Sequence, residues 1–466
     1  MAHQPNVVIF LCDDLGYGDL GCYGHPHIKT PNIDKLAAGG IRFTDFYSAS
    51  PVCSPSRVGL LTGRSPNLAG IYDWIPSDGK PRLDAREQVH LRKFETTLPF
   101  LLKVNGYATC LSGKWHCNGL FNSKSQPQPD TFGFDHWFAT HNNAAPSHEN
   151  PTNFVRNGKP VGKIEGYSCQ IVVDEAATWL REVKKNGPHD PFFIFATFHE
   201  PHEPIASPPE LVKEYMDVAI NEDQAQYFAN VANVDKAVGR FMSVLDELKL
   251  REDTLVIFTS DNGPETLNRY KRATRSHGQP GPLRGMKLHT HEAGFRVAGI
   301  ANWSEHITPG QVIKTPVSAL DLLPTICKLT DTRMPERRVL QGADIRPILR
   351  GESTFERELP LHWCFFNAIN EARVAMRDGQ WKVLARIKKA DGKPLAQIRN
   401  VTPKKREMLL QTKLTDWEVY DVTTDIGEQN NLAESRPELT KELGSRLDGL
   451  YRELIDKSHV WTPTIK

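Results

Sequence analysis

Three continuous β-prone apolar runs constrain the fold of this chain more than any other feature. They cover residues 6–12, 191–198 and 254–260. A strand that lacks an alternation of polar and apolar residues is typical of a parallel sheet buried between layers of helices. Amphipathic helical patterns lie between the runs at 168–185 and 227–248, and a shorter one at 32–40. We therefore predict an α/β fold with a large mixed, mostly parallel sheet sandwiched by helices.

The sequence pattern changes after about residue 355. Residues 373–384 contain two short strand-like segments around Asp378-Gly379, which is a hairpin signal. A further strand is expected at 417–422 and a closing helix at 437–455. Because 466 residues are too many for one small core, we predict two parts. These are a large domain over residues 1–355 and a small C-terminal α+β subdomain with an antiparallel sheet over residues 356–466.

The composition argues against nucleic-acid and membrane partners. The formal net charge is +1, and no apolar run approaches the roughly 18–20 residues that span a bilayer. The eight cysteines contain no Cys-x-x-Cys pair, so they do not require a disulfide framework. No signal-peptide pattern precedes the first apolar run. We expect a periplasmic or secreted protein that has lost its signal peptide, with a cytoplasmic protein as the alternative.

Two acidic pairs follow two of the predicted buried strands directly. Asp13-Asp14 comes after the first run and Asp261-Asn262 after the third. In open α/β sheets, ligands bind beyond the carboxyl ends of the strands. The two pairs would then form an all-oxygen cluster that suits Ca²⁺ or Mg²⁺. Each pair alone could equally cap a turn, but both together favour a metal site.

Cys53 begins a segment with the features of a helix start. Pro55 suits the first turn of a helix, where its missing N–H costs nothing. Cys53 is therefore placed near a helix N-terminus, where the dipole favours an anion. From the residues alone, a reactive low-pKa thiolate and an ordinary cysteine in a turn both remain open.

The segment Cys53-Ser54-Pro55-Ser56-Arg57, followed by Leu61-Thr62-Gly63-Arg64, resembles the signature of type I sulfatases. Further segments match this family in the same order, so that the resemblance covers essentially the whole chain: 6–19, 30–34, 113–116, 201–204, 260–263, 283–287 and 420–432. The resemblance implies an alkaline-phosphatase-like fold. The segments 70–76 and 130–158 are similar to bacterial glycan sulfatases of the N-acetylgalactosamine and galactose sulfatase kind.

In that family a maturation enzyme oxidises the cysteine to formylglycine, an aldehyde held as its hydrate. The resemblance therefore implies formylglycine at position 53 and Ca²⁺ as the metal, with Mg²⁺ less expected. One hydroxyl of the hydrate attacks sulfur, and the second then expels the sulfate; a serine would remain as a stable sulfate ester. The implied metal ligands are an oxygen of the modified Cys53, Asp13, Asp14, Asp261 and Asn262.

The resemblance also implies roles for five other side chains. Lys114 and Lys287 would neutralise the sulfate oxygens, and Arg57 would hold the hydrate with its planar fork. His116 would act as the base in the release of sulfate. His202 would protonate the leaving oxygen as the general acid.

Substrate contacts are the least specific part of the prediction. Residues 130–158 read as a loop rich in His, Asn and aromatic residues, which a carbohydrate pocket would use but which are also ordinary loop residues. The candidates, for each of which a structural role in a loop is the alternative, are His141, Asn142, His199, His289 and His291.

The resulting functional hypothesis is a sulfatase that hydrolyses a sulfate monoester on a carbohydrate, with galactose or N-acetylgalactosamine sulfate favoured. Its expected partners are a sulfated carbohydrate and the maturation enzyme. The sequence predicts no particular oligomeric state. The alternatives are a phosphonate monoester or phosphodiester hydrolase of the same superfamily, and a catalytically inactive glycan-binding relative.

Overall fold

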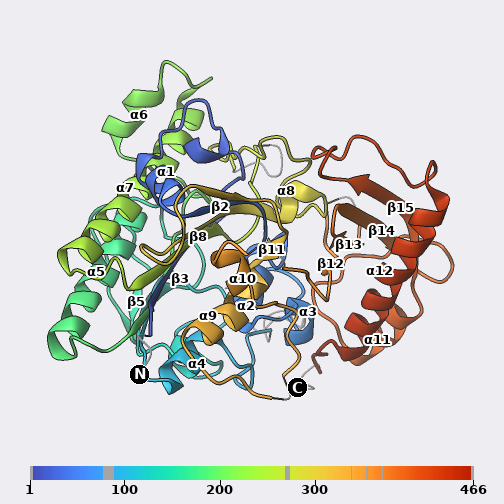
Figure 1. The fold of residues 1–466 in the computed structure, drawn as a ribbon, viewed down its shortest axis with the longest axis horizontal. Coiled ribbons are helices and arrows are strands. Elements are labelled where there is room, and N and C mark those ends of the chain that lie inside the picture. Colours follow the sequence, from blue (N-terminus) through green and yellow to red (C-terminus); the bar gives the residue numbers. More distant parts are fainter. Residues whose placement is uncertain are drawn as a thin grey trace.

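The computed structural model describes residues 4–76, 89–267, 273–336, 338–352, 355–369 and 371–462. A large sheet with helices on both sides forms most of the molecule, and a smaller sheet near the C-terminus lies beside it (Figure 1). Among the described helices, none has the length and apolar character needed to cross a membrane.

The large sheet is mixed and mostly parallel. Its strand order is β10-β2-β9-β8-β1-β7-β3-β4-β5-β6, with β11 beside β2. The five strands from β8 to β4 in this order are parallel, whereas β9 is antiparallel to both neighbours. The strands are β1 (Asn6–Cys12), β2 (Ile41–Tyr47), β3 (Ala108–Lys114), β4 (His136–Thr140), β5 (Val155–Arg156), β6 (Lys159–Pro160), β7 (Phe192–Thr197), β8 (Thr254–Ser260), β9 (Arg296–Asn302), β10 (Gln311–Ile313) and β11 (Val317–Ser318).

Helices cover both faces of this sheet. Alternate residues of β1 explain the two layers, since Val8 and Phe10 pack in one core and Val7 and Ile9 in the other, all fully buried. The first layer holds α1 (Pro31–Ala38), α5 (Ser168–Asn186), α6 (Pro209–Tyr215) and α7 (Glu222–Glu247). The second holds α2 (Cys53–Thr62), α3 (Pro66–Ala69), α4 (Leu98–Val104), α9 (Leu322–Leu329) and α10 (Arg346–Leu349). The predicted fold class is confirmed.

The C-terminal sheet is antiparallel, as predicted. Its strands follow chain order: β12 (Leu361–Phe365), β13 (Arg373–Asp378), β14 (Trp381–Lys388) and β15 (Lys413–Asp421). The hairpin turns at Gly379, whose φ of 54° explains the Asp-Gly signal. The helices α11 (Pro403–Leu410) and α12 (Pro437–Lys457) share a core with this sheet. The division at residue 355 stays a prediction.

The two parts are joined by aromatic packing. Trp363 of β12 stacks on Phe295, with ring centroids 4.4 Å apart. Phe295 ends the short helix α8 (Glu292–Phe295), which precedes β9. The C-terminal sheet therefore packs directly against the segment that follows Lys287.

The prediction of a loop over residues 130–158 is wrong in part. β4 and β5 lie within it, because residues 136–140 pair in parallel with β3 and extend the large sheet. The polar residues on both sides of this five-residue strand concealed it in the sequence.

Candidate active site

The carboxyl ends of β1 and β8 bring the predicted acidic residues together at one edge of the large sheet. The two strands are parallel neighbours, paired to their last residues. The amide of Asp261 donates to the last carbonyl of β1 at 3.0 Å. The side-chain amide of Asn262 donates to Asp14 Oδ1 at 2.7 Å. With Asp13, these four side chains form a cluster in which each residue is at most 1% exposed.

Cys53 is the first residue of α2 and faces this cluster. Its Sγ and one carboxylate oxygen from each of Asp13, Asp14 and Asp261 all lie within 4.8 Å of one another. Burial raises the pKa of the Cys53 thiol although nearby lysines lower it. A reactive low-pKa thiolate is therefore disfavoured, because the loss of hydration outweighs the cations.

Two buried lysines pair with the first two carboxylates. Lys114, the last residue of β3, contacts Asp13 Oδ2 through Nζ. Lys287 Nζ lies 2.6 Å from Asp14 Oδ2. Both ammonium groups therefore stand beside the cysteine, in positions where they can neutralise an anion bound next to it.

The third carboxylate, that of Asp261, is destabilised in its ionised form. Arg57 Nε donates to Asp261 Oδ2 at 2.9 Å. Nevertheless, burial and repulsion from Asp13 raise the pKa of Asp261 to about 7. Asp13 Oδ1 and Asn262 Oδ1 are buried oxygens without a hydrogen-bond partner. Crowded carboxylates with unpartnered oxygens fit a hard divalent cation such as Ca²⁺ or Mg²⁺.

Two histidines present different nitrogens to the site. His116 Nε2 lies 3.0 Å from the Ile75 carbonyl, which can only accept, so Nε2 carries the hydrogen. Its Nδ1 has no partner and keeps a lone pair, and burial lowers the pKa of His116 well below its usual value. His202 Nδ1 donates to the Glu203 carbonyl at 2.6 Å, which leaves Nε2 facing Asp14 Oδ2 at 3.5 Å. Burial lowers the pKa of His202 to about 4.

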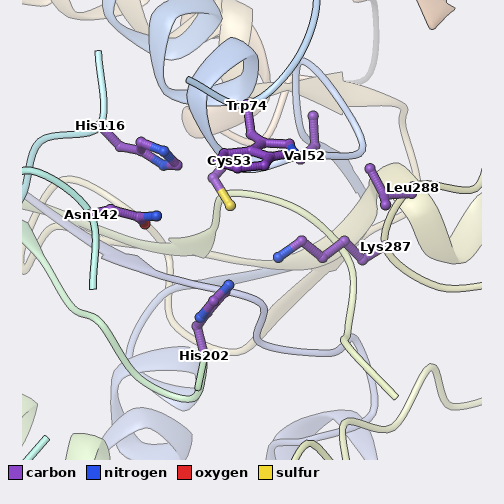
Figure 2. Close-up of a pocket in the computed structure, with 8 residues that line it drawn as sticks. All are labelled: Val52, Cys53, Trp74, His116, Asn142, His202, Lys287 and Leu288. Carbon is purple, nitrogen blue, oxygen red and sulfur yellow. The ribbon is translucent and has the colours of Figure 1, made fainter. Parts of the chain in front are cut away.

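A cavity of about 270 Å³ opens over the cysteine (Figure 2). Of the five residues predicted to contact substrate, only Asn142 lines it. The lining residues are Val52, Cys53, Trp74, His116, Asn142, His202, Lys287 and Leu288.

The other four candidates lie outside this lining, and as substrate contacts they stay predictions. His141 Nε2 is 2.6 Å from a backbone carbonyl, and His199 Nε2 is 2.8 Å from a threonine hydroxyl. His291 Nε2 lies 3.3 Å from Glu418 Oε2, and His289 packs near it with ring centroids 6.3 Å apart. The rings of His141, His199 and His291 thus each have a polar partner within the protein.

Three lining residues were not among the predicted site residues: Val52, Trp74 and Leu288. Trp74 lies in the segment 70–76, whose resemblance to glycan sulfatases was the one signal for it. Leu288 is held by backbone bonds, from its amide to the Pro51 carbonyl at 2.8 Å and from the Ile369 amide to its carbonyl at 3.2 Å. Apolar residues carry no motif, so their place in the wall could not be read from the sequence.

The sequence profile of the sulfatase family matches residues 5–332, which contain every residue of the cluster and the cavity. The chain belongs to the sulfatase family. This family consists of sulfuric ester hydrolases, and the resemblance noted from the motifs is confirmed.

Named relatives support the same assignment. N-acetylgalactosamine-6-sulfatase of Rattus norvegicus is 33% identical over 360 residues, which cover 74% of this chain and 66% of the rat enzyme, slightly less than two thirds. Arylsulfatase A of Bos taurus is 32% identical over 473 residues, which cover 95% of this chain and 86% of the relative.

Solved structures share the fold over nearly the whole chain. The crystal structure of Ps i-CgsB in complex with k-i-k-neocarrahexaose has a TM-score of 0.78 and 26% identity, and covers 96% of this chain and 93% of its own. A structure solved for work on the metabolism of multiple glycosaminoglycans by Bacteroides thetaiotaomicron has a TM-score of 0.76 and 25% identity, and covers 97% of this chain and 100% of its own.

Proposed function

We propose that this protein hydrolyses a sulfate monoester on a sugar of galactose or N-acetylgalactosamine type, using formylglycine made from Cys53 and a Ca²⁺ ion. The observation that carries the proposal is the meeting of Cys53 with three carboxylates within 4.8 Å. The preference for these sugars rests on the named relatives, among them the N-acetylgalactosamine-6-sulfatase of rat.

The metal would be held by the oxygens of Asp13, Asp14, Asp261 and Asn262, with an oxygen of the modified Cys53. A bound Ca²⁺ would offset the carboxylate charge and lower the pKa of a hydroxyl at position 53. The variable, all-oxygen ligand set of Ca²⁺ suits a cluster of carboxylates and an amide better than the strict octahedron of Mg²⁺ does. The formylglycine hydrate would supply two hydroxyl groups on one carbon at the start of α2.

Side chains of the protein would then provide charge stabilisation, positioning of the hydrate and proton transfer. Lys114 and Lys287 would stabilise charge on the sulfate oxygens from two directions. Arg57, which is 1% exposed, would hold the hydrate with its guanidinium group. The lone pair on His116 Nδ1 would take up a proton. His202 would act as the acid in its imidazolium form, in which Nε2, beside Asp14, carries the proton that goes to the leaving oxygen.

Sulfate release from defined sugars tests the proposal. The protein is co-expressed with a formylglycine-generating enzyme and assayed on galactose and N-acetylgalactosamine sulfates, with a phosphodiester and a phosphonate monoester alongside. We expect sulfate release that requires Ca²⁺. Dominant turnover of the phosphorus esters would instead support the alternative of a phosphonate monoester or phosphodiester hydrolase. Binding without turnover would support a catalytically inactive relative.

Because sulfated polysaccharides lie outside cells, we also propose that the protein acts in an exported compartment.

A further inference from the structure

The cavity over Cys53 has two chemically different walls. Val52, Trp74 and Leu288 are the large apolar residues of the lining, which they share with Cys53 (Figure 2). The polar side of the cavity holds His116, Asn142, His202 and Lys287. At about 270 Å³ the cavity is slightly smaller than the roughly 300–1,000 Å³ of pockets for drug-sized ligands. The cavity thus offers both apolar surface and polar groups to a sulfated sugar ring.

Trp74 is partly exposed although the residues beside it are buried and hydrogen-bonded. Its side chain is 40% exposed, whereas Tyr72 and Ile75 are at most 2% exposed. The Ile75 amide donates to Ser54 Oγ at 3.0 Å, and the Ile75 carbonyl accepts from His116 Nε2 at 3.0 Å. The segment is thus anchored to α2 on one side and to a site histidine on the other. An aromatic side chain that a cavity wall carries on an anchored backbone offers a large contact surface to a ligand.

We propose that Trp74 is the platform for the apolar C–H face of the sulfated sugar and so determines specificity for pyranose sulfates. The inference rests on the proposed function. A galactose-type ring carries several C–H groups on one face and hydroxyls along its edge. The C–H face would stack on the indole, and the hydroxyl edge would face Asn142 and His202 on the polar side. The ester sulfate would then lie between Cys53 and Lys287.

In this proposal Trp74 contacts the sugar ring and not the sulfate group. Its role can therefore be distinguished from a structural one by comparing a sugar sulfate with inorganic sulfate as ligands. Lys114 and Lys287 bind the charged group whether or not a sugar is attached. Removing the indole therefore weakens binding of a sugar sulfate and leaves binding of inorganic sulfate unchanged. A variant that merely disturbed the cavity would weaken both.

Binding is measured by calorimetry in the Cys53→Ala background, so that the result does not require turnover. The ligands are N-acetylgalactosamine 6-sulfate and inorganic sulfate. Adding Trp74→Ala should raise the Kd of the sugar sulfate by roughly 10-fold or more, as expected for the loss of an aromatic stacking partner, and change that of inorganic sulfate by less than about twofold. Trp74→Phe should restore most of the affinity. Phe94→Ala, which removes an 85% exposed aromatic outside the cavity lining, serves as the matched control.

Two results would overturn the inference: an unchanged Kd for the sugar sulfate in Trp74→Ala, or an equal loss of affinity for both ligands. The proposed function is judged separately by sulfate release from the matured wild type. In that active protein, Trp74→Ala should raise KM for the sugar sulfate by a similar factor while kcat changes by less than about threefold. A loss confined to kcat would also contradict a platform for the sugar.

Discussion

Two buried charge clusters in this molecule differ in how well their members are paired. The active-site cluster comprises Asp13, Asp14, Arg57, Lys114, Asp261, Asn262 and Lys287. The interface cluster, where the C-terminal sheet meets the large sheet, comprises Asp45, Glu292, Arg296, Arg377 and Lys382. Every buried side-chain nitrogen and oxygen of the interface cluster has a partner, whereas two oxygens of the active-site cluster have none.

The interface cluster shows what a satisfied buried network looks like. Lys382 Nζ lies 2.8 Å from Glu292 Oε1, and Arg296 Nη1 lies 3.0 Å from Oε2. Asp45 is paired with Arg296 at 2.9 Å and with Arg377 at 3.1 Å. Burial alone would raise the pKa of Glu292, but the three cations hold it at about 2. The five residues of this cluster are therefore paired with one another and with their neighbours in the protein, whereas the adjacent Glu428 has one buried oxygen, Oε1, without a partner.

The active-site cluster has as many cations as carboxylates and still leaves Asp261 with a raised pKa of about 7. The difference indicates that this cluster is arranged for additional charges, a cation on the carboxylates and an anion on the lysines. Stability and function are therefore expected to separate between the two clusters.

The largest expected effect comes from neutralising a carboxylate of the active-site cluster. Asp261→Asn should lower sulfate release at least roughly 100-fold, because a charged metal ligand is lost. The unfolding midpoint should stay the same or rise, since the raised pKa of Asp261 shows that its ionised form is costly in the fold. Assays of sulfate and thermal unfolding measure both. A strongly destabilised variant would mean that this cluster is structural, like the interface cluster.

The next effect comes from breaking the interface cluster. Lys382→Met leaves Glu292 buried without its nearest cation and should cost about 3–5 kcal/mol of unfolding free energy. Urea unfolding measures the loss, with Lys404→Met on the exposed face of α11 as a neutral control. A Lys382→Met protein as stable as the wild type would contradict the account of this network.

Calcium should stabilise the protein through the active-site cluster. After chelation, Ca²⁺ at 100 times its Kd should add about 2.7 kcal/mol to the unfolding free energy. Mg²⁺ at the same concentration should add less, and Asp261→Asn should lose most of the effect. Differential scanning fluorimetry detects the shift without any need for turnover. An equal calcium shift in wild type and Asp261→Asn would place the ion elsewhere.

The smallest effect concerns Glu428, which joins the interface to the loop that carries Lys287. Its carboxylate accepts from the Glu292 amide at 2.8 Å, and its carbonyl accepts from Arg284 at 2.9 Å. Burial, with repulsion from Glu292, raises the pKa of Glu428 to about 8. The stability that the protonated carboxyl contributes is thus present below about pH 4.5 and is lost as the pH rises through 8.

Glu428→Gln should therefore remove part of the decline in stability between pH 5 and pH 8. The expected difference is on the order of 1 kcal/mol, measured by urea unfolding at both pH values. Identical slopes in variant and wild type would show that Glu428 does not hold its proton in the folded state.

The difference between the clusters also explains what the sequence could predict. The acidic pairs follow buried strands directly, and the carboxyl ends of parallel strands lie at the same edge of a sheet. The proximity of Asp13 and Asp261 could therefore be predicted from the sequence. Cys53 was predicted at a helix start from Pro55, and α2 begins there. Local signals were enough because each residue lies within one or two positions of an element's end.

The interface cluster and the cavity wall carried no such signal. Asp45 and Arg377 are 332 residues apart, and their pairing depends on how the two sheets pack. Trp74 and Leu288 converge from separate loops, whose paths are set by tertiary hydrogen bonds. For the same reason, the sequence could not predict which way the side chains of His141, in the expected loop, and His199, after a buried strand, would point.

The chemical state of Cys53 decides whether this protein works through formylglycine. Mass spectrometry of the peptide across Cys53, on samples matured to different extents, gives the fraction of aldehyde and hydrate in each. Sulfate release on the same samples should rise in proportion to that fraction and extrapolate to zero for the plain thiol. Full activity in protein that carries only an unmodified Cys53 would contradict the account.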